Sequence, residues 1–297
     1  MRSPRVPLLI AAATLLSLTL GTAAAPATPT APAPPETGPP RTRAVHVDVL
    51  GPTVSIPPGS FANSFAECPA SAPHVVGGGN RSAESASALR LTMTHPAASG
   101  GSPTPHQGWE IEAVNTDPVN AHSVTAYAVC SADPVVQRFS PGLVVSPGVA
   151  GVVAASCLPD EAVTGGGMSL GVLPGSSGPA AYIQFSTPKA DGWQTGALNR
   201  DTVGSRIRAV AICSPKPHSI SIDSSFTVLP PGQSGSAIAI CPAGRVPSGG
   251  GTADAVLRGV FLYVSTGGLT PNGWEVHAIN TTSQPQNLRA AVVCTAP

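Results

Sequence analysis

The sequence PGQSGSAIAICPAGRVPSGGG at residues 231–251 decides the fold, because its landmarks occur three times along the chain. They are a Pro-Gly pair, a strand-like run ending in Cys, and three consecutive glycines, followed by Gly-Trp, Ala, Asn and a second Cys. The first copy contains Pro58-Gly59, Cys68, Gly77-Gly78-Gly79, Gly108-Trp109, Ala113, Asn115 and Cys130. The second contains Pro147-Gly148, Cys157, Gly165-Gly166-Gly167, Gly192-Trp193, Ala197, Asn199 and Cys213. The third contains Pro231-Gly232, Cys241, Gly249-Gly250-Gly251, Gly273-Trp274, Ala278, Asn280 and Cys294.

The spacing of these landmarks is fixed. In every copy the first Cys lies nine residues after the Gly of the Pro-Gly pair. The Ala and the Asn always follow the Trp by four and six residues. Offsets conserved at three places indicate an internal repeat, and we expect three repeats at residues 44–131, 132–214 and 215–297.

The N-terminal residues are typical of an export signal. Arg2 and Arg5 precede an apolar run at residues 8–20, and small residues follow at 21–25. This order predicts a secretory signal peptide at residues 1–25. Residues 26–43 are rich in proline and are predicted to be a disordered linker. We therefore expect a secreted protein with no membrane attachment after signal removal.

Composition limits the fold classes and the kinds of binding partner that we expect. The 297 residues include 34 Pro and 32 Gly, which favours turn-rich β structure over helices. The formal net charge is +0, and only 10% of residues are charged. Nucleic-acid binding is not expected, because counterion release requires clustered Lys and Arg.

The six cysteines fall two to a repeat. In an exported protein this distribution favours disulfides within each repeat, namely Cys68–Cys130, Cys157–Cys213 and Cys241–Cys294. Each bridge would contribute about 4 kcal/mol in the chain-entropy model. A metal site is not expected, because the sequence has no C-x-x-C and no His recurs near the cysteines.

Alternating small residues predict a hollow inside each repeat. Ala occupies the position two residues before each first Cys, at 66, 155 and 239, and small residues line the strand into each second Cys. Period-two spacing places each set on one strand face. We expect the single tryptophan of each repeat, Trp109, Trp193 or Trp274, to fill this space over the disulfide. The fold class is all-β, with three disulfide-closed, β-sandwich-like units packed together; the alternative is a single pseudo-three-fold β-prism.

Two further landmarks allow more than one interpretation. The triple glycine indicates a β-bulge or a close crossing of backbones. The recurring Asn is expected to bond to backbone in the turn after the Trp strand. The alternative is that the Asn binds a sugar or an ion.

Catalysis has weak support. Gly167-Met168-Ser169-Leu170-Gly171 matches the G-x-S-x-G pattern, but the Pro/Gly-rich residues 174–179 cannot form the helix that a nucleophile elbow requires. Glu110 and Glu112 share one strand face, which is interpreted as solvated. A glycosidase would need two carboxylates across a cleft, and no such pair can be placed. No catalytic residue, metal or cofactor is predicted.

Loops and aromatic side chains give the candidate binding residues. The segment before the Trp is longest in the first copy and contains His95, His106 and Gln107. Binding sites favour variable loops on a rigid frame. Phe61, Phe65 and Tyr127 form either a buried cluster or an exposed aromatic face for a glycan or a partner.

The order of landmarks resembles a module found in uncharacterised secreted proteins of high-GC bacteria and in some phage tail-associated proteins. The resemblance covers nearly all of the chain after residue 44, and Cys157-Leu158-Pro159 departs from it by a one-residue insertion. It supplies no catalytic residues. The expected function is a non-catalytic structural or binding role outside the cell, with weak glycan or cell-wall binding as its natural form. The alternative is a secreted hydrolase that uses loops specific to one copy.

Overall fold

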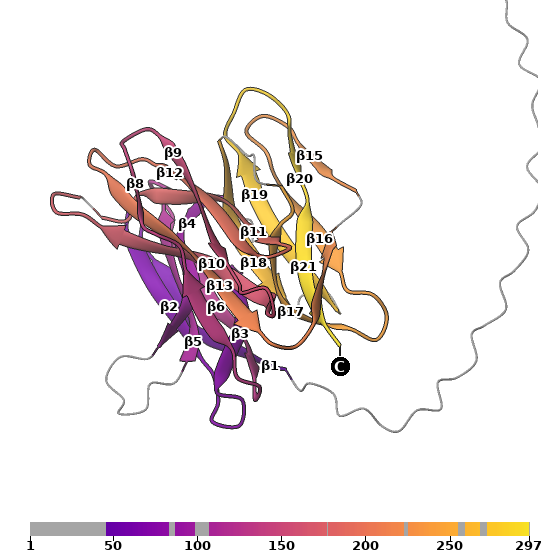
Figure 1. The fold of residues 1–297 in the computed structure, drawn as a ribbon. Coiled ribbons are helices and arrows are strands. Elements are labelled where there is room, and N and C mark those ends of the chain that lie inside the picture. The colour runs from indigo at the N-terminus through magenta and orange to yellow at the C-terminus, as the bar shows by residue number, and fades with distance from the viewer. Residues whose placement is uncertain are drawn as a thin grey trace, which may run out of the picture. The chain divides into compact units, whose positions relative to one another are not determined.

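A computed structural model describes residues 46–82, 87–98, 107–176, 178–222, 225–254, 259–267 and 272–296. These residues form 21 β-strands, and the predicted all-β class is confirmed (Figure 1). The predicted signal peptide at 1–25 and the predicted linker at 26–43 lie outside the described residues. No helix in the described ranges is long and apolar enough to cross a membrane.

We call residues 46–131, 132–214 and 215–296 the N-terminal, middle and C-terminal segments. The N-terminal segment contains β1 (Val47–Ile56), β2 (Phe61–Glu67), β3 (His74–Arg81), β4 (Leu89–Ala98), β5 (Gln107–Asn115) and β6 (His122–Ser131). The middle segment contains β7 (Val136–Phe139), β8 (Leu143–Val145), β9 (Ala150–Ser156), β10 (Ala162–Val172), β11 (Ala181–Lys189), β12 (Gly192–Asn199) and β13 (Ser205–Ser214). The C-terminal segment contains β14 (His218–Ile222), β15 (Thr227–Leu229), β16 (Ser234–Ile240), β17 (Val246–Thr252), β18 (Val260–Gly267), β19 (Gly273–Asn280), β20 (Gln286–Leu288) and β21 (Ala290–Thr295).

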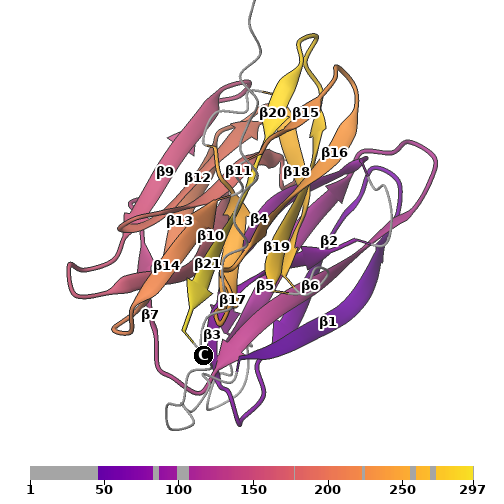
Figure 2. The same ribbon diagram turned by 90° about the vertical axis from the view of Figure 1, so that its right-hand side faces the viewer.

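Strand pairing follows the same order in each segment. The strand that contains the second Cys is central to one antiparallel trio, giving β1-β6-β3, β7-β13-β10 and β14-β21-β17. The strand that begins with Gly-Trp is central to the other trio, giving β2-β5-β4, β9-β12-β11 and β16-β19-β18. Figure 2 shows β14, β21 and β17 side by side.

Sheets continue from one segment into another. Asn80 of β3 pairs with Ser265 of β18, which joins N-terminal and C-terminal trios into one six-stranded sheet. Met168 of β10 pairs with Thr94 of β4, which joins the middle and N-terminal segments. At the third junction, the Thr252 hydroxyl of β17 accepts a bond from the Ser186 amide of β11 at 3.2 Å. Each segment is therefore bonded to both others.

The triple glycines explain how these junctions form. Each marks a register shift in its ladder, at residues 75–77, 163–165 and 247–249, so the predicted bulge is confirmed. A Cβ on Gly79, Gly167 or Gly251 would lie 1.7, 1.9 or 2.0 Å from a backbone oxygen of a neighbouring segment. The predicted backbone crossing is also confirmed, because only glycine permits this approach.

The residues preceding the triple glycines meet in the core. Thr164 donates its hydroxyl hydrogen bond to the Val76 carbonyl oxygen at 2.7 Å. Ser248 donates to the Thr164 carbonyl oxygen at 2.9 Å. A Cβ on Gly77 would lie 2.1 Å from the Ser248 carbonyl oxygen, so the third contact has the same closeness. Val76 has no hydroxyl, and this contact therefore lacks the side-chain bond of the other two.

Not every apolar strand face is covered. Ile238 and Ile240 of β16 are 36% and 56% exposed. β16 is an edge strand, and its outward face has no layer over it. The aromatic cluster of the N-terminal segment is divided: Tyr127 is buried and Phe61 is 52% exposed.

Candidate binding sites

The three tryptophans have a structural role. Each indole N–H group donates to a hydroxyl on a paired strand of the same segment. The bonds run from Trp109 to Thr94 at 2.9 Å, from Trp193 to Ser186 at 2.8 Å and from Trp274 to Ser265 at 3.0 Å. All three side chains are buried, as predicted. An Ala pairs directly with each Trp in the adjacent strand, at 66, 155 and 239.

Each indole packs against the middle glycine of a triple, and the sequence analysis did not predict this contact. A Cβ on the middle glycine of each triple would lie 2.3–2.4 Å from an indole atom of its own segment. The indole therefore rests on bare backbone of the facing trio. The fixed presence of one Trp and one Gly-Gly-Gly per copy was the signal for this contact.

The side chains of the three recurring asparagines form hydrogen bonds with backbone groups of their own segments. The Asn115 amide donates to the carbonyl oxygens of Ile56 and Asn120 at 2.9 and 2.8 Å. Its oxygen accepts from the Asp117 amide at 2.9 Å. Asn199 and Asn280 make the corresponding bonds. The predicted turn role is confirmed, and the sugar-ligand alternative is wrong because both ends of each amide already have backbone partners.

The predicted disulfides are confirmed. Cys68–Cys130, Cys157–Cys213 and Cys241–Cys294 are bonded, each with Cα atoms 5.7 Å apart. Three such bridges indicate an oxidising environment. Glu161 lies beside Cys157 and Cys213, but those sulfurs are bonded to each other and are not available as metal ligands.

Ser169 is not placed as a nucleophile. It lies within β10 and pairs with Arg208 of β13, so the G-x-S-x-G match is a stretch of continuous strand. The nucleophile elbow requires a sharp turn between a strand and a helix. Ser169 lines a surface hollow of about 270 Å³ together with Leu170, Gly171, Arg206 and Arg208.

The loop residues singled out from the sequence are dispersed. The Gln107 side-chain oxygen accepts a hydrogen bond from the Val75 amide at 3.2 Å, which ties β5 to β3. His95 bonds through Nδ1 to the Pro96 carbonyl oxygen at 2.7 Å. His106 lies outside the described residues. The suggestion that these three residues belong to a binding loop therefore stays a prediction.

A polar face covers the trio β2-β5-β4. Asn63 donates to Glu110 at 3.0 Å, and Thr92 donates to the Glu112 carboxylate at 2.7 Å. His95 Nε2 lies 3.9 Å from the second oxygen of Glu110. Burial raises the pKa of Glu112, and burial lowers the pKa of His95. The face therefore holds two carboxylates and an imidazole in fixed positions, half shielded from solvent.

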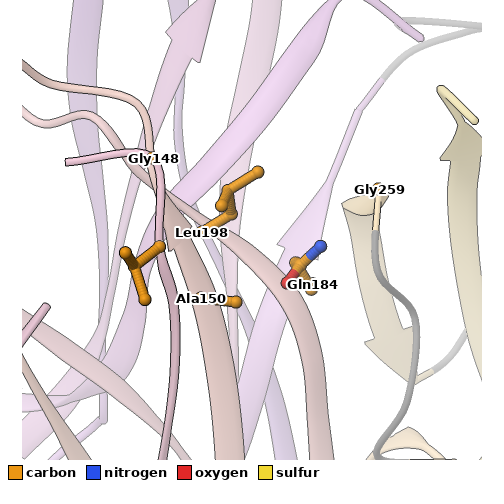
Figure 3. Close-up of a pocket in the computed structure, with 6 residues that line it drawn as sticks. Gly148, Ala150, Gln184, Leu198 and Gly259 are labelled. Carbon is orange, nitrogen blue, oxygen red and sulfur yellow. The ribbon is translucent and has the colours of Figure 1, made fainter. Parts of the chain in front are cut away.

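The equivalent face of the middle segment has a hollow of about 350 Å³. It is lined by Gly148, Val149, Ala150, Gln184, Leu198 and Gly259. Figure 3 shows the Gln184 amide between Leu198 of β12 and Gly259, the residue before β18. The wall is mainly apolar, with one amide, and its volume lies in the range of small-molecule pockets.

An aromatic and cationic cluster adjoins this hollow. Tyr182 pairs with the lining residue Leu198, and its ring meets Phe261 edge-on with centroids 5.9 Å apart. The guanidinium groups of Arg90 and Arg200 lie 5.6 and 5.8 Å from the Phe261 ring centroid. Burial lowers the pKa of Arg90, and the positive charge of Arg200 lowers it further.

Strand register shows which side chains in the other two segments lie at the positions equivalent to those beside the hollow. The residues that precede the recurring asparagines each pair with two neighbours, giving the rows Phe61–Val114–Arg90, Ala150–Leu198–Tyr182 and Ser234–Ile279–Phe261. In the first row the Phe61 ring is in contact range of Gly178. In the second row Ala150 is too small to fill that space.

Comparison with known proteins adds no assignment to these sites. No protein-family model matches the chain, and no curated protein matches it.

Proposed function

We propose that this chain is an exported, non-catalytic binding protein built from three repeats in a pseudo-three-fold arrangement. The three junctions support the arrangement, because each links one trio of a segment to the other kind of trio in the next segment. A cyclic set of junctions favours the prism-like alternative over three separate sandwiches. The three disulfides support export.

We further propose carbohydrate binding, on a cell wall or another extracellular glycan, at the polar face of β2, β5 and β4. The observation that carries this proposal is the fixed pair of carboxylates, Glu110 and Glu112, each held by a hydrogen bond from a neighbouring strand. Carboxylate oxygens accept hydrogen bonds from sugar hydroxyl groups. The half-exposed ring of Phe61 offers an apolar surface beside the same strands.

The test is a pull-down on purified cell wall, together with a glycan array. The double variant Glu110→Gln/Glu112→Gln should lower retention at least about tenfold, since charge-assisted hydrogen bonds are about twice as strong as neutral ones. Glu275→Gln is the matched control, because Glu275 occupies the position of Glu110 in the C-terminal segment and pairs with Ile238 instead of Phe65. Retention that survives the double change contradicts the proposed face.

The competing proposal is a hydrolase that uses a site in one segment. Ser169→Ala separates the two proposals. Hydrolysis of a small ester by the purified chain that disappears in this variant would favour the enzyme. Retained wall binding without such hydrolysis would favour the binding protein.

A further inference from the structure

The hollow of the middle segment corresponds to a place that a phenyl ring occupies in the N-terminal segment. We propose that this hollow binds a small aromatic anion, a six-membered ring bearing one carboxylate or sulfonate group. The proposal goes beyond glycan binding and does not depend on it, because the residues that line the hollow do not include Glu110, Glu112 or Phe61.

The shape argument rests on strand register. Phe61, Ala150 and Ser234 are each the second residue after a Pro-Gly pair and pair with Val114, Leu198 and Ile279 respectively. In the N-terminal segment, the Phe61 ring lies across from Gly178, which precedes β11. In the middle segment, Ala150 lies across a hollow from Gly259, which precedes β18. A ligand ring beside Ala150 would therefore replace a side-chain ring that the fold already accommodates elsewhere.

The row of Ser234, Ile279 and Phe261 differs from the other two. Ser234 forms a hydrogen bond with the Tyr263 phenol, so that position is occupied by a residue of the same segment. Tyr263 is buried in the C-terminal segment. The middle segment has Gln184 at the corresponding bulge, and its amide lines the hollow. The apolar walls with one amide suit an aromatic ring that carries a polar substituent.

The charge argument rests on two guanidinium groups. Arg90 and Arg200 both flank Phe261, and both act electrostatically on the Tyr182 phenol next to the hollow. Within the described ranges neither forms an ion pair shorter than 4.0 Å. The Arg90 guanidinium donates hydrogen bonds to the backbone carbonyl oxygens of Ser87 and Leu89, which are neutral acceptors. Two arginines that repel each other, on an aromatic cluster next to the apolar hollow, favour a ligand with negative charge.

Phenylacetate is the probe, and its neutral analogue phenylacetamide tests the charge. Binding to the full exported chain is followed by amide chemical shifts in two-dimensional NMR. We expect saturable shifts at residues 148–150 and 198 with phenylacetate, and affinity about tenfold lower for phenylacetamide. Arg90→Gln/Arg200→Gln should reduce phenylacetate affinity by a similar factor.

Ala150→Phe should abolish binding by filling the hollow as Phe61 does. Ala154→Phe is the matched control, because Ala154 lies on the same exposed face of β9 but pairs with Gln194, outside the hollow. It should bind as the unaltered chain does. Absence of saturable binding to the unaltered chain, or full binding by Ala150→Phe, overturns the site.

The arginine variants keep the proposal testable if Ala150→Phe does not fold. Equal affinity for phenylacetate and phenylacetamide overturns the assignment of an anion. Glu110→Gln/Glu112→Gln should leave phenylacetate binding unchanged, so a failed pull-down on cell wall and a failed phenylacetate titration remain separate results.

Discussion

The buried junctions and the outward rows of this protein differ in how similar the residue types of the three segments are. At the junctions, the same residue types recur at the same places: the triple glycine, the Trp and the Asn each make one kind of contact three times. On the outward rows, equivalent positions carry Phe61, Ala150 and Ser234. The buried contacts leave no freedom in residue type, because neighbouring backbones touch. The outward rows leave side chains free to differ, and any binding specificity must therefore lie there.

The largest expected effect comes from a glycine at a junction. Gly167→Ala places a Cβ 1.9 Å from the Thr94 carbonyl oxygen, and a backbone atom cannot move aside alone. We expect a loss of about 3 kcal/mol or more in the free energy of unfolding. Gly171→Ala in the same strand is the control, because its Cβ would lie 3.6 Å from the nearest atom and should change stability by less than about 0.5 kcal/mol. Urea unfolding measures both, and equal stability of the two variants would break the comparison.

The recurring asparagines should have nearly equal effects. Asn199→Ala leaves the carbonyl oxygens of Val145 and Val203 without their side-chain donor. Each lost bond in a buried site costs about 1–3 kcal/mol, so we expect a loss of about 2 kcal/mol or more. Asn115→Ala and Asn280→Ala should match it within about 0.5 kcal/mol if the three turns are equivalent. A much smaller loss at one of them would show that its turn is held in another way.

A smaller effect is expected where the core departs from three-fold regularity. Val76→Thr has nearly the same shape and adds the hydroxyl that Thr164 and Ser248 already use at their contacts. Donation to the Ser248 carbonyl oxygen should stabilise the fold by about 1 kcal/mol. Thr164→Val should destabilise it by a similar amount. In thermal unfolding, a higher melting temperature for Val76→Thr and a lower one for Thr164→Val would support the equivalence of these positions. A strong loss of stability in Val76→Thr would contradict it.

The smallest effect concerns an ion pair of the middle segment. Arg138 donates to both carboxylate oxygens of Glu161 at 2.7 and 2.6 Å, and with the Leu158 amide it lowers the Glu161 pKa from 4.5 to about 2. A pKa lowered by folding means that the ionised carboxylate stabilises the native state above pH 4.5. That contribution is lost as the pH falls toward about 2.

Glu161→Gln should therefore reduce stability near pH 7 and flatten the loss of stability between pH 4.5 and 2. The variant and the unaltered chain should converge at the acid end. The other segments have Ala72 and Arg245 four residues after their first Cys, so this pH dependence belongs to the middle segment. An identical acid response in both proteins would show that the ion pair contributes nothing to folding.

The sequence alone was sufficient for contacts that lie within one segment. Cys pairing, Trp burial and the turn role of the Asn all follow from fixed offsets and from strand periodicity. The row of Phe61, Ala150 and Ser234 was also accessible, because each lies two residues after the Gly of its Pro-Gly pair.

Contacts between repeats were not accessible in the same way. Arg90, Tyr182 and Phe261 precede their tryptophans by 19, 11 and 13 residues, so loops of unequal length hide their equivalence. Their meeting depends on which strand edge of one segment reaches the next, and periodicity within a strand carries no information about that choice. The seat of the indole on a middle glycine was missed for a related reason, since glycine leaves no side chain to predict from.

The junction between β3 and β18 also has a consequence for the timing of assembly. It joins Asn80 to Ser265, two residues separated by most of the chain. During synthesis, the N-terminal segment cannot obtain this neighbour until β18 has been made. The edge of β3 that does not pair with β6 therefore stays unpaired through that interval, which delays completion of the six-stranded sheet.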